Sequence, residues 1–129
     1  MFLTSLTQAQ KEAFICLAYN VVVSDGELAV GEHVMMDNMR LEMGLPLSFE
    51  ARYLPLDGIE KIFNSRRSRI VALIDLIRLG YADGAFEVEE QCLLADLCEA
   101  FEISETDFAR LQNWVRRFIS LEREAQAMM

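Results

Sequence analysis

An eight-residue pattern occurs twice in this chain of 129 residues. Residues 25–32 read DGELAVGE, and residues 83–90 read DGAFEVEE, so the two copies lie 58 residues apart. The copies share Asp, Gly, a large apolar residue, Val and Glu at equivalent positions. Each copy follows a mostly apolar run and precedes a run with helical spacing. Because Asp-Gly favours a turn, the repeat predicts one helical hairpin that is used twice.

The first hairpin has clear helix boundaries. Thr7 followed by Gln10 is typical of a capping box, and it predicts a helix that ends near Ser24. A second helix is expected from about Val30, with Gly44 as its C-terminal cap. The apolar residues of this second helix are expected to fill the core: Val34, Met35, Met36, Met39 and Met43.

The rest of the chain continues the helical pattern. Pro46 stops the second helix, and short helices are expected at about 48–52 and after Gly58. Residues 70–79 are apolar on nearly all sides, which predicts a helix in the middle of a bundle. Further helices are expected at 88–101 and after Ser104. Since no segment alternates as a strand would, the predicted fold class is all-α, a single-domain helical bundle of about six to seven helices.

The chain has the length of one domain, which is predicted to cover residues 1–129. Its repeat halves are expected at about 7–44 and 66–102, as two related helical hairpins with a pseudo-two-fold repeat. Connecting short helices are expected at about 45–65, because an intervening segment of this length needs structure of its own. The sequence leaves open whether the two Asp-Gly turns meet or lie at opposite ends.

Composition excludes some partners. The formal net charge of −9 disfavours contact with a nucleic-acid backbone. The three cysteines are odd in number and lack metal-ligand spacing, so core packing in a reducing compartment is expected. No signal peptide or membrane-spanning run is recognisable. These features predict a cytoplasmic protein, with a protein partner and an oligomeric state that the sequence does not identify.

The two hairpins resemble the tellurite-resistance TerB-like family. The matching segments are residues 19–32, which include VVVSDGELAVGE, and residues 77–90, which include LGYADGAFEVEE. Residues 94–111 (LADLCEAFEISETDFARL) are similar to the C-terminal half of that family. The resemblance implies a small all-helical bacterial protein linked to tellurite resistance or stress, with acidic candidates for metal binding and no enzymatic activity. The chain departs from the family at Ala29 and Glu87, where Ser, Thr or Asp is common.

Two interpretations of the repeated acidic residues stay open. As caps, Glu32 and Glu90 fall at the third helical position, where a carboxylate opposes the positive end of the helix dipole. Asp25 and Asp83 would then satisfy backbone donors in their own turns. As ligands, the four carboxylates would converge on a hard divalent cation, namely calcium, magnesium or manganese. The capping interpretation is favoured because short motifs are often misleading.

No catalytic constellation accompanies these residues. A calcium-binding EF-hand is excluded, because its first ligand position would fall on Val21 in one copy and Leu79 in the other. His33 is the single histidine, and no nucleophile is placed beside it by the sequence. The predicted function is therefore a non-catalytic TerB-like protein that acts through protein contacts. The alternatives are an interaction adaptor without metal and, third, a metal-dependent enzyme that uses the carboxylates.

A basic cluster stands out against the acidic background. Arg66, Arg67 and Arg69 lie together, and Arg116 and Arg117 follow in the last helix. Such a cluster is compatible with a grip on a phosphate or on an acidic partner. A solvated surface that balances the acidic charge is the alternative.

Overall fold

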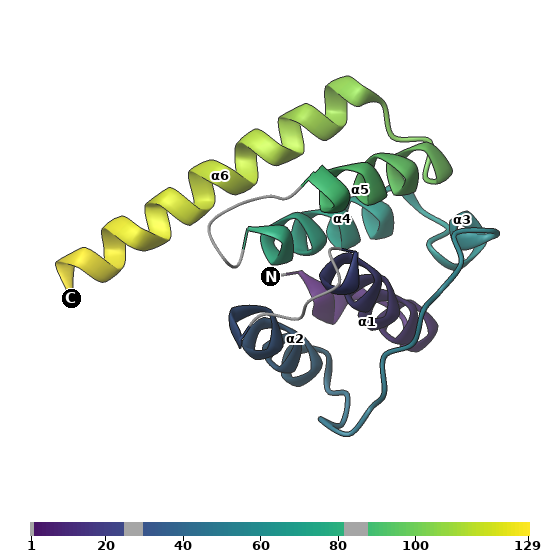
Figure 1. The fold of residues 1–129 in the computed structure, drawn as a ribbon, viewed down its shortest axis with the longest axis horizontal. Helices are drawn as coiled ribbons and strands as arrows, with labels where there is room; N and C mark the ends of the chain where they lie inside the picture. The colour runs from purple at the N-terminus through teal and green to yellow at the C-terminus, as the bar shows by residue number, and fades with distance from the viewer. Residues whose placement is uncertain (1, 25–29, 82–87) are drawn as a thin grey trace.

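The computed structural model describes residues 2–24, 30–81 and 88–129, which form helices and connecting segments without a β-strand (Figure 1). The elements in chain order are η1 (Leu3–Ser5), α1 (Gln8–Val23), α2 (Val30–Met43), α3 (Ile59–Ile62), α4 (Arg66–Gly80), α5 (Val88–Ala100) and α6 (Glu105–Met128). The predicted all-α fold is confirmed, and six α-helices in these ranges agree with the predicted number. The pseudo-two-fold repeat stays a prediction.

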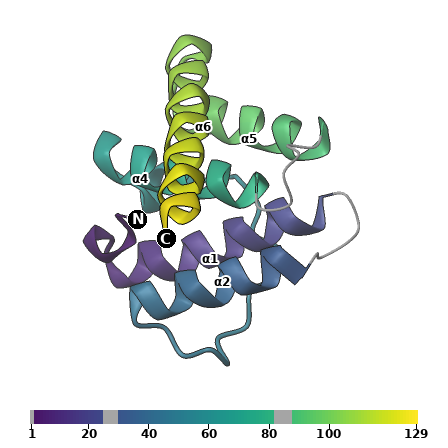
Figure 2. The same cartoon turned by 90° about the vertical axis from the view of Figure 1, so that its left-hand side faces the viewer.

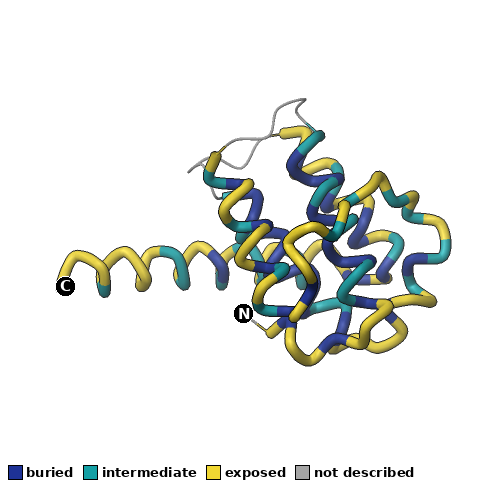
Figure 3. The backbone as a smooth tube through the Cα atoms, turned by 90° about the horizontal axis from the view of Figure 1, so that it is seen from below, coloured by how far each residue is buried: buried dark blue, intermediate teal, exposed yellow. Residues whose placement is uncertain are grey.

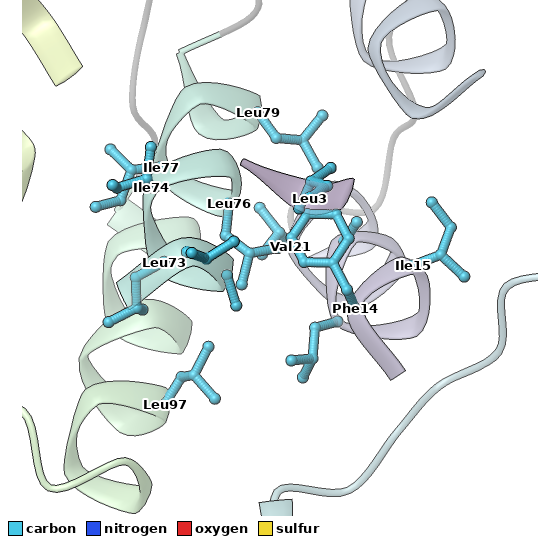
Figure 4. Packing of buried hydrophobic residues seen from close by; sticks show 14 of the residues in the cluster. Leu3, Phe14, Ile15, Val21, Leu73, Ile74, Leu76, Ile77, Leu79 and Leu97 are labelled. Carbon is cyan, nitrogen blue, oxygen red and sulfur yellow. The ribbon is translucent and has the colours of Figure 1, made fainter. Parts of the chain in front are cut away.

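Helix α4 forms the centre of the bundle. It contacts α1, α2, α5, α6 and η1. Leu73 and Leu76 are fully buried, and Figure 4 shows both among the core side chains that surround α4. Phe14 and Val21 of α1 pack in the same cluster. The run that is apolar on nearly all sides therefore occupies the predicted central position.

Local caps set the helix boundaries as the sequence predicts. The amide of Gln10 donates to Thr7 Oγ1 at 3.2 Å, and the amide of Thr7 donates to Gln10 Oε1 at 3.0 Å, which completes the capping box. Ser104 Oγ accepts from the amide of Asp107 at 3.1 Å at the start of α6. Gly44 ends α2 with φ of 72°, a left-handed conformation that glycine adopts without steric cost.

The buried face of α2 differs in one residue from the prediction. Met36, Met39 and Met43 are buried as expected, and Met35 is partly buried. Val34 is exposed, so its assignment to the core is wrong. At 100° per residue, Val34 lies about 200° away from Met36, on the opposite face of the helix.

The segment between α2 and α3 does not contain the helix predicted at 48–52. One short helix, α3, forms in the region 45–65 where short helices were expected. Side chains of α1 and α2 bond to the backbone of this segment, which also contains isolated turns such as the bond from the amide of Phe49 to the carbonyl of Pro46 at 2.9 Å. Asn20 of α1 donates to the carbonyl of Leu54 at 2.8 Å and accepts from its amide at 3.2 Å. Arg40 of α2 donates to the carbonyl of Phe49 at 3.2 Å.

Arg69 joins three separate parts of the backbone near the start of α4. Its guanidinium donates to the carbonyls of Phe63 (2.6 Å), Glu60 (2.9 Å) and Phe101 (3.1 Å). Phe63 and Phe101 also meet edge to face, with ring centroids 5.5 Å apart. One side chain therefore ties the end of α3 and the end of α5 to α4.

Helix α6 extends beyond the bundle. Figure 1 shows its C-terminal part leaving the other helices, and Figure 3 shows that this part is mostly exposed. Val115 is the buried residue of this helix. None of the helices in the described ranges combines the length and the apolar character of a bilayer-crossing segment.

We expect Arg69→Lys to lower the free energy of unfolding by about 2 kcal/mol, because an ammonium cannot reproduce the three-way fork and charged hydrogen bonds contribute about 1.5–3 kcal/mol each. Urea unfolding followed by circular dichroism measures this change. Arg67→Lys is the matched control, since Arg67 is exposed on the same helix turn. Equal stability of the two variants would show that the three carbonyl contacts do not hold the bundle together.

Candidate functional site

The two glutamates of the repeated pattern occupy equivalent positions in the structure. Glu32 is the third residue of α2, and Glu90 is the third residue of α5. Both are buried, with exposed fractions of 5% and 3%. Glutamate is seldom buried to this degree unless it is paired, hydrogen-bonded or bound to a metal. The repeat is therefore matched in environment as well as in sequence at these two residues.

The helix ends that flank the two patterns lie at one end of the bundle. In Figure 2, α1 and α4 end on the same side of the molecule, and α2 and α5 begin there. Figure 3 shows the same grouping from below. Asp25 and Asp83, the other two predicted ligands, lie outside the described residues. The structure thus brings the starts of the two glutamate-bearing helices to one end, a point that the sequence left open.

The chemistry available at this end is that of oxygen ligands. Each glutamate lies in the first turn of its helix, where the positive end of the dipole favours a negative charge. The same carboxylates are of the kind that calcium, magnesium or manganese prefers. Within the ranges 2–24, 30–81 and 88–129, no three His, Cys, Asp or Glu side chains are grouped closely enough to hold a metal ion. Glu32 and Glu90 are the two of the four predicted ligands that lie in the described residues, and the metal site stays a prediction.

The cap contribution of these glutamates is measurable. We expect Glu32→Ala and Glu90→Ala each to lower the free energy of unfolding by about 1–2 kcal/mol, because each removes a first-turn carboxylate. Glu89→Ala is the matched control, since Glu89 is the exposed neighbour of Glu90 in the same helix turn. Chemical denaturation of the three variants tests this, and a loss as large in Glu89→Ala would contradict a position-specific role.

The histidine and cysteines occupy contrasting environments. His33 is exposed on α2. Cys98 is buried with an exposed fraction of 4%, and desolvation raises the pKa of its thiol to about 12. Cys92 is exposed, so its assignment to core packing is wrong. Its helix, α5, is apolar on one side only, and Cys92 lies off the face formed by Leu94 and Cys98.

The thiols should react at different rates. At pH 8, only a fraction of about 10⁻⁴ of a thiol with a pKa near 12 is ionised to the reactive thiolate. That fraction rises as the pH approaches the pKa. We expect iodoacetamide to label Cys92 rapidly in the folded protein and Cys98 only after unfolding. Mass spectrometry of the labelled peptides, with a fully denatured sample as control, distinguishes the two sites. Rapid labelling of Cys98 in the native protein would show that its burial is transient.

A buried ion pair in α4 was not predicted. Asp75 has an exposed fraction of 1%, and one of its carboxylate oxygens accepts from Arg78 Nη1 at 2.9 Å. The guanidinium of Arg78 also lies over the ring of Phe118 at 5.3 Å and is 3.9 Å from Glu122. The pair therefore links the core of α4 to the middle of α6. The sequence does contain a signal for this pair, because Asp75 and Arg78 are oppositely charged residues at i and i+3 inside an otherwise apolar run.

The basic cluster near residue 66 has two roles. Arg69 donates hydrogen bonds to three backbone carbonyls, so its guanidinium is not available to bind a phosphate. Arg66 and Arg67 are exposed, and they line two adjoining hollows beside α4. The larger hollow, of about 480 Å³, lies between α4 and α6. Its position depends on the packing of two helices that are distant in sequence.

Comparison with known proteins gives one match. Residues 57–113 match the family model described as tellurite resistance protein TerB. This range covers a little less than half of the chain, from the segment before α3 to the middle of α6, and it includes the second copy of the repeated pattern. Neither a curated protein nor a solved structure matches the chain. The predicted resemblance to the TerB-like family is thus confirmed over residues 57–113.

Proposed function

We propose that this protein is a non-catalytic helical module of the TerB type. It binds a divalent cation at the end of the bundle where α2 and α5 begin, and it acts through contacts with another protein. The link to tellurite resistance or a wider stress response is carried over from the family match at residues 57–113. Glu32, Glu90, Asp25 and Asp83 are the proposed ligands.

One observation carries the cation half of this proposal. Two glutamates at equivalent helix positions are both buried, and their helices begin at the same end of the molecule. A cap role is satisfied by a carboxylate that is half exposed, so capping alone does not require this burial. A cation bound between the two helix starts would stabilise both glutamates in their buried positions. The attraction between metal and carboxylate strengthens as water is removed.

The environments of the reactive side chains favour a role without catalysis. His33 is exposed on the surface of α2. The thiol of Cys98 stays protonated at neutral pH because burial raises its pKa to about 12. General acid–base or nucleophilic chemistry needs such groups to be poised and accessible.

A cation titration tests the proposal. We expect calcium, magnesium or manganese to raise the melting temperature and to release or absorb heat in calorimetry. A free cation concentration of about 100 times the Kd adds about 2.7 kcal/mol to the free energy of unfolding. Glu32→Gln and Glu90→Gln should each reduce the shift strongly, because a neutral amide oxygen lacks the negative charge that attracts a divalent cation.

Glu89→Gln is the control, since it removes the same charge from an exposed position one residue away. It should bind the cation as the unmodified protein does. Failure of all three cations to change the melting temperature or to give heat would overturn the metal site. The two buried glutamates would then act as helix caps.

A further inference from the structure

The hollow between α4 and α6 has an apolar floor and a basic rim. Ile70 and Ile74 of α4 face Leu111 and Trp114 of α6 across about 480 Å³. Trp114 is half buried and stacks on Phe118, with ring centroids 5.6 Å apart. The exposed arginines of the rim are Arg66, Arg110 and Arg117. We name this surface, with these residues, the α4/α6 groove.

A second hollow of about 470 Å³ adjoins the α4/α6 groove. The two share Arg66, Ile70 and Ile74, and Phe2 also lines the second. The shared residues are spaced i, i+4 and i+8, so they form a stripe of about 12 Å along α4. This length equals about two turns of a bound helix.

The charge of the groove is opposite to that of the chain. Arg66, Arg67, Arg110 and Arg117 line the two hollows, and Asp107 is their acidic residue. The chain as a whole carries a formal charge of −9. Four guanidiniums and one carboxylate therefore form a local basic region on an acidic protein.

Asp107 shows how these arginines hold a carboxylate. Arg66 Nη2 donates to Asp107 Oδ2 at 2.8 Å, and Arg110 Nη1 lies 3.5 Å from Oδ1. The hydrogen bond from Arg66, together with the charges of both arginines, holds the pKa of Asp107 below its usual range. One carboxylate thus bridges two guanidiniums at one end of the groove. In the described part of the chain, Arg67 and Arg117 make no ion pair and remain available to another carboxylate.

We propose that the α4/α6 groove binds an acidic amphipathic helix of a partner protein. The apolar stripe fits side chains at i, i+4 and i+7 of such a helix, and the arginines on both sides fit flanking Glu or Asp residues. A lone phosphate fits less well, because the rim arginines are spread along two helices and do not converge on a free point. The proposal deepens the protein-contact half of the function above and does not require the cation.

The net charge of the chain does not oppose this docking at physiological salt. The Debye length is about 10 Å at 0.1 M ionic strength, so distant acidic residues are largely screened while the rim arginines act at contact. The same net charge disfavours approach to an anionic membrane surface over its wider area. Charge complementarity therefore favours a protein helix as the occupant.

A designed peptide tests the groove. The probe is a labelled synthetic helix of about 18 residues with leucines at i, i+4 and i+7 flanked by glutamates, and its control carries glutamine at every glutamate. Trp114 is the single tryptophan of the chain, so its fluorescence reports directly from the groove. We expect the acidic peptide to bind at least about tenfold tighter than the glutamine peptide, and to weaken as salt is raised.

Charge reversal on the rim provides the second test. The double variant Arg110→Glu/Arg117→Glu should lower the affinity for the acidic peptide by about tenfold or more. Two arginines that attract the peptide's glutamates are replaced by glutamates that repel them. Arg123→Glu, on the same helix but outside the groove, should leave peptide affinity within about twofold. The double variant should keep the cation-dependent shift in melting temperature, which separates failure of the groove from failure of the cation site.

Three results would overturn the groove proposal. The first is equal affinity for the acidic and glutamine peptides, and the second is an equal effect of the rim and control variants. The third is a different occupant, shown by stronger binding to anionic lipid vesicles or by sedimentation of a dimer that the rim variant dissociates. Retention of the cation shift in any of these cases would leave the proposed cation site standing.

Discussion

Removal of α4 from water is the constraint on which the other described helices depend. Ten of its fifteen residues are buried, so it needs neighbours on nearly every side. Full burial of each Leu or Ile contributes about 1.5–3 kcal/mol, so the apolar residues of α4 together contribute more than any single polar contact. Burial also encloses Asp75, whose charge requires a partner. Because that partner, Arg78, also lies over Phe118, the polar requirement of α4 fixes the position of α6.

Local signals in the sequence predicted most of the helices because their causes are local. Thr7, Gly44 and Ser104 act on backbone groups within a few residues, and the structure places a helix boundary at each. The segment before α3 could not be predicted in this way. Its backbone at Leu54 is held by Asn20, which lies 34 residues earlier in the sequence, and the course of the segment has no pattern of its own. Tertiary hydrogen bonds there replace the short helix that local pattern favoured.

The candidate site, like the fold, was predictable where it depends on local sequence and not where it depends on tertiary packing. Duplication of the pattern identified Glu32 and Glu90, and their equal burial follows from equal positions in two helices. That the two helices begin at one end of the bundle depends on how the hairpins pack, which no short motif encodes. The α4/α6 groove is harder to predict from the sequence, because Arg66 and Asp107, which meet in it, are 41 residues apart. Only the arginine cluster marked that surface in advance, and one of its members, Arg69, has a structural role instead.

The contacts that hold α6 also explain why a groove remains beside it. Its apolar residues repeat at helical spacing, yet Val115 is its buried residue. Polar and aromatic contacts join it to α4 through Arg66 with Asp107, through Arg78 with Phe118, and through Arg116, which donates to the hydroxyl of Tyr81 at 3.1 Å. Leu111 and Trp114 lie between these contacts, partly buried against the core and partly open to the groove. Walls that are already ordered lose little conformational entropy when a ligand binds. The ion pairs that secure the last helix therefore pre-organise the surface that we assign to a partner.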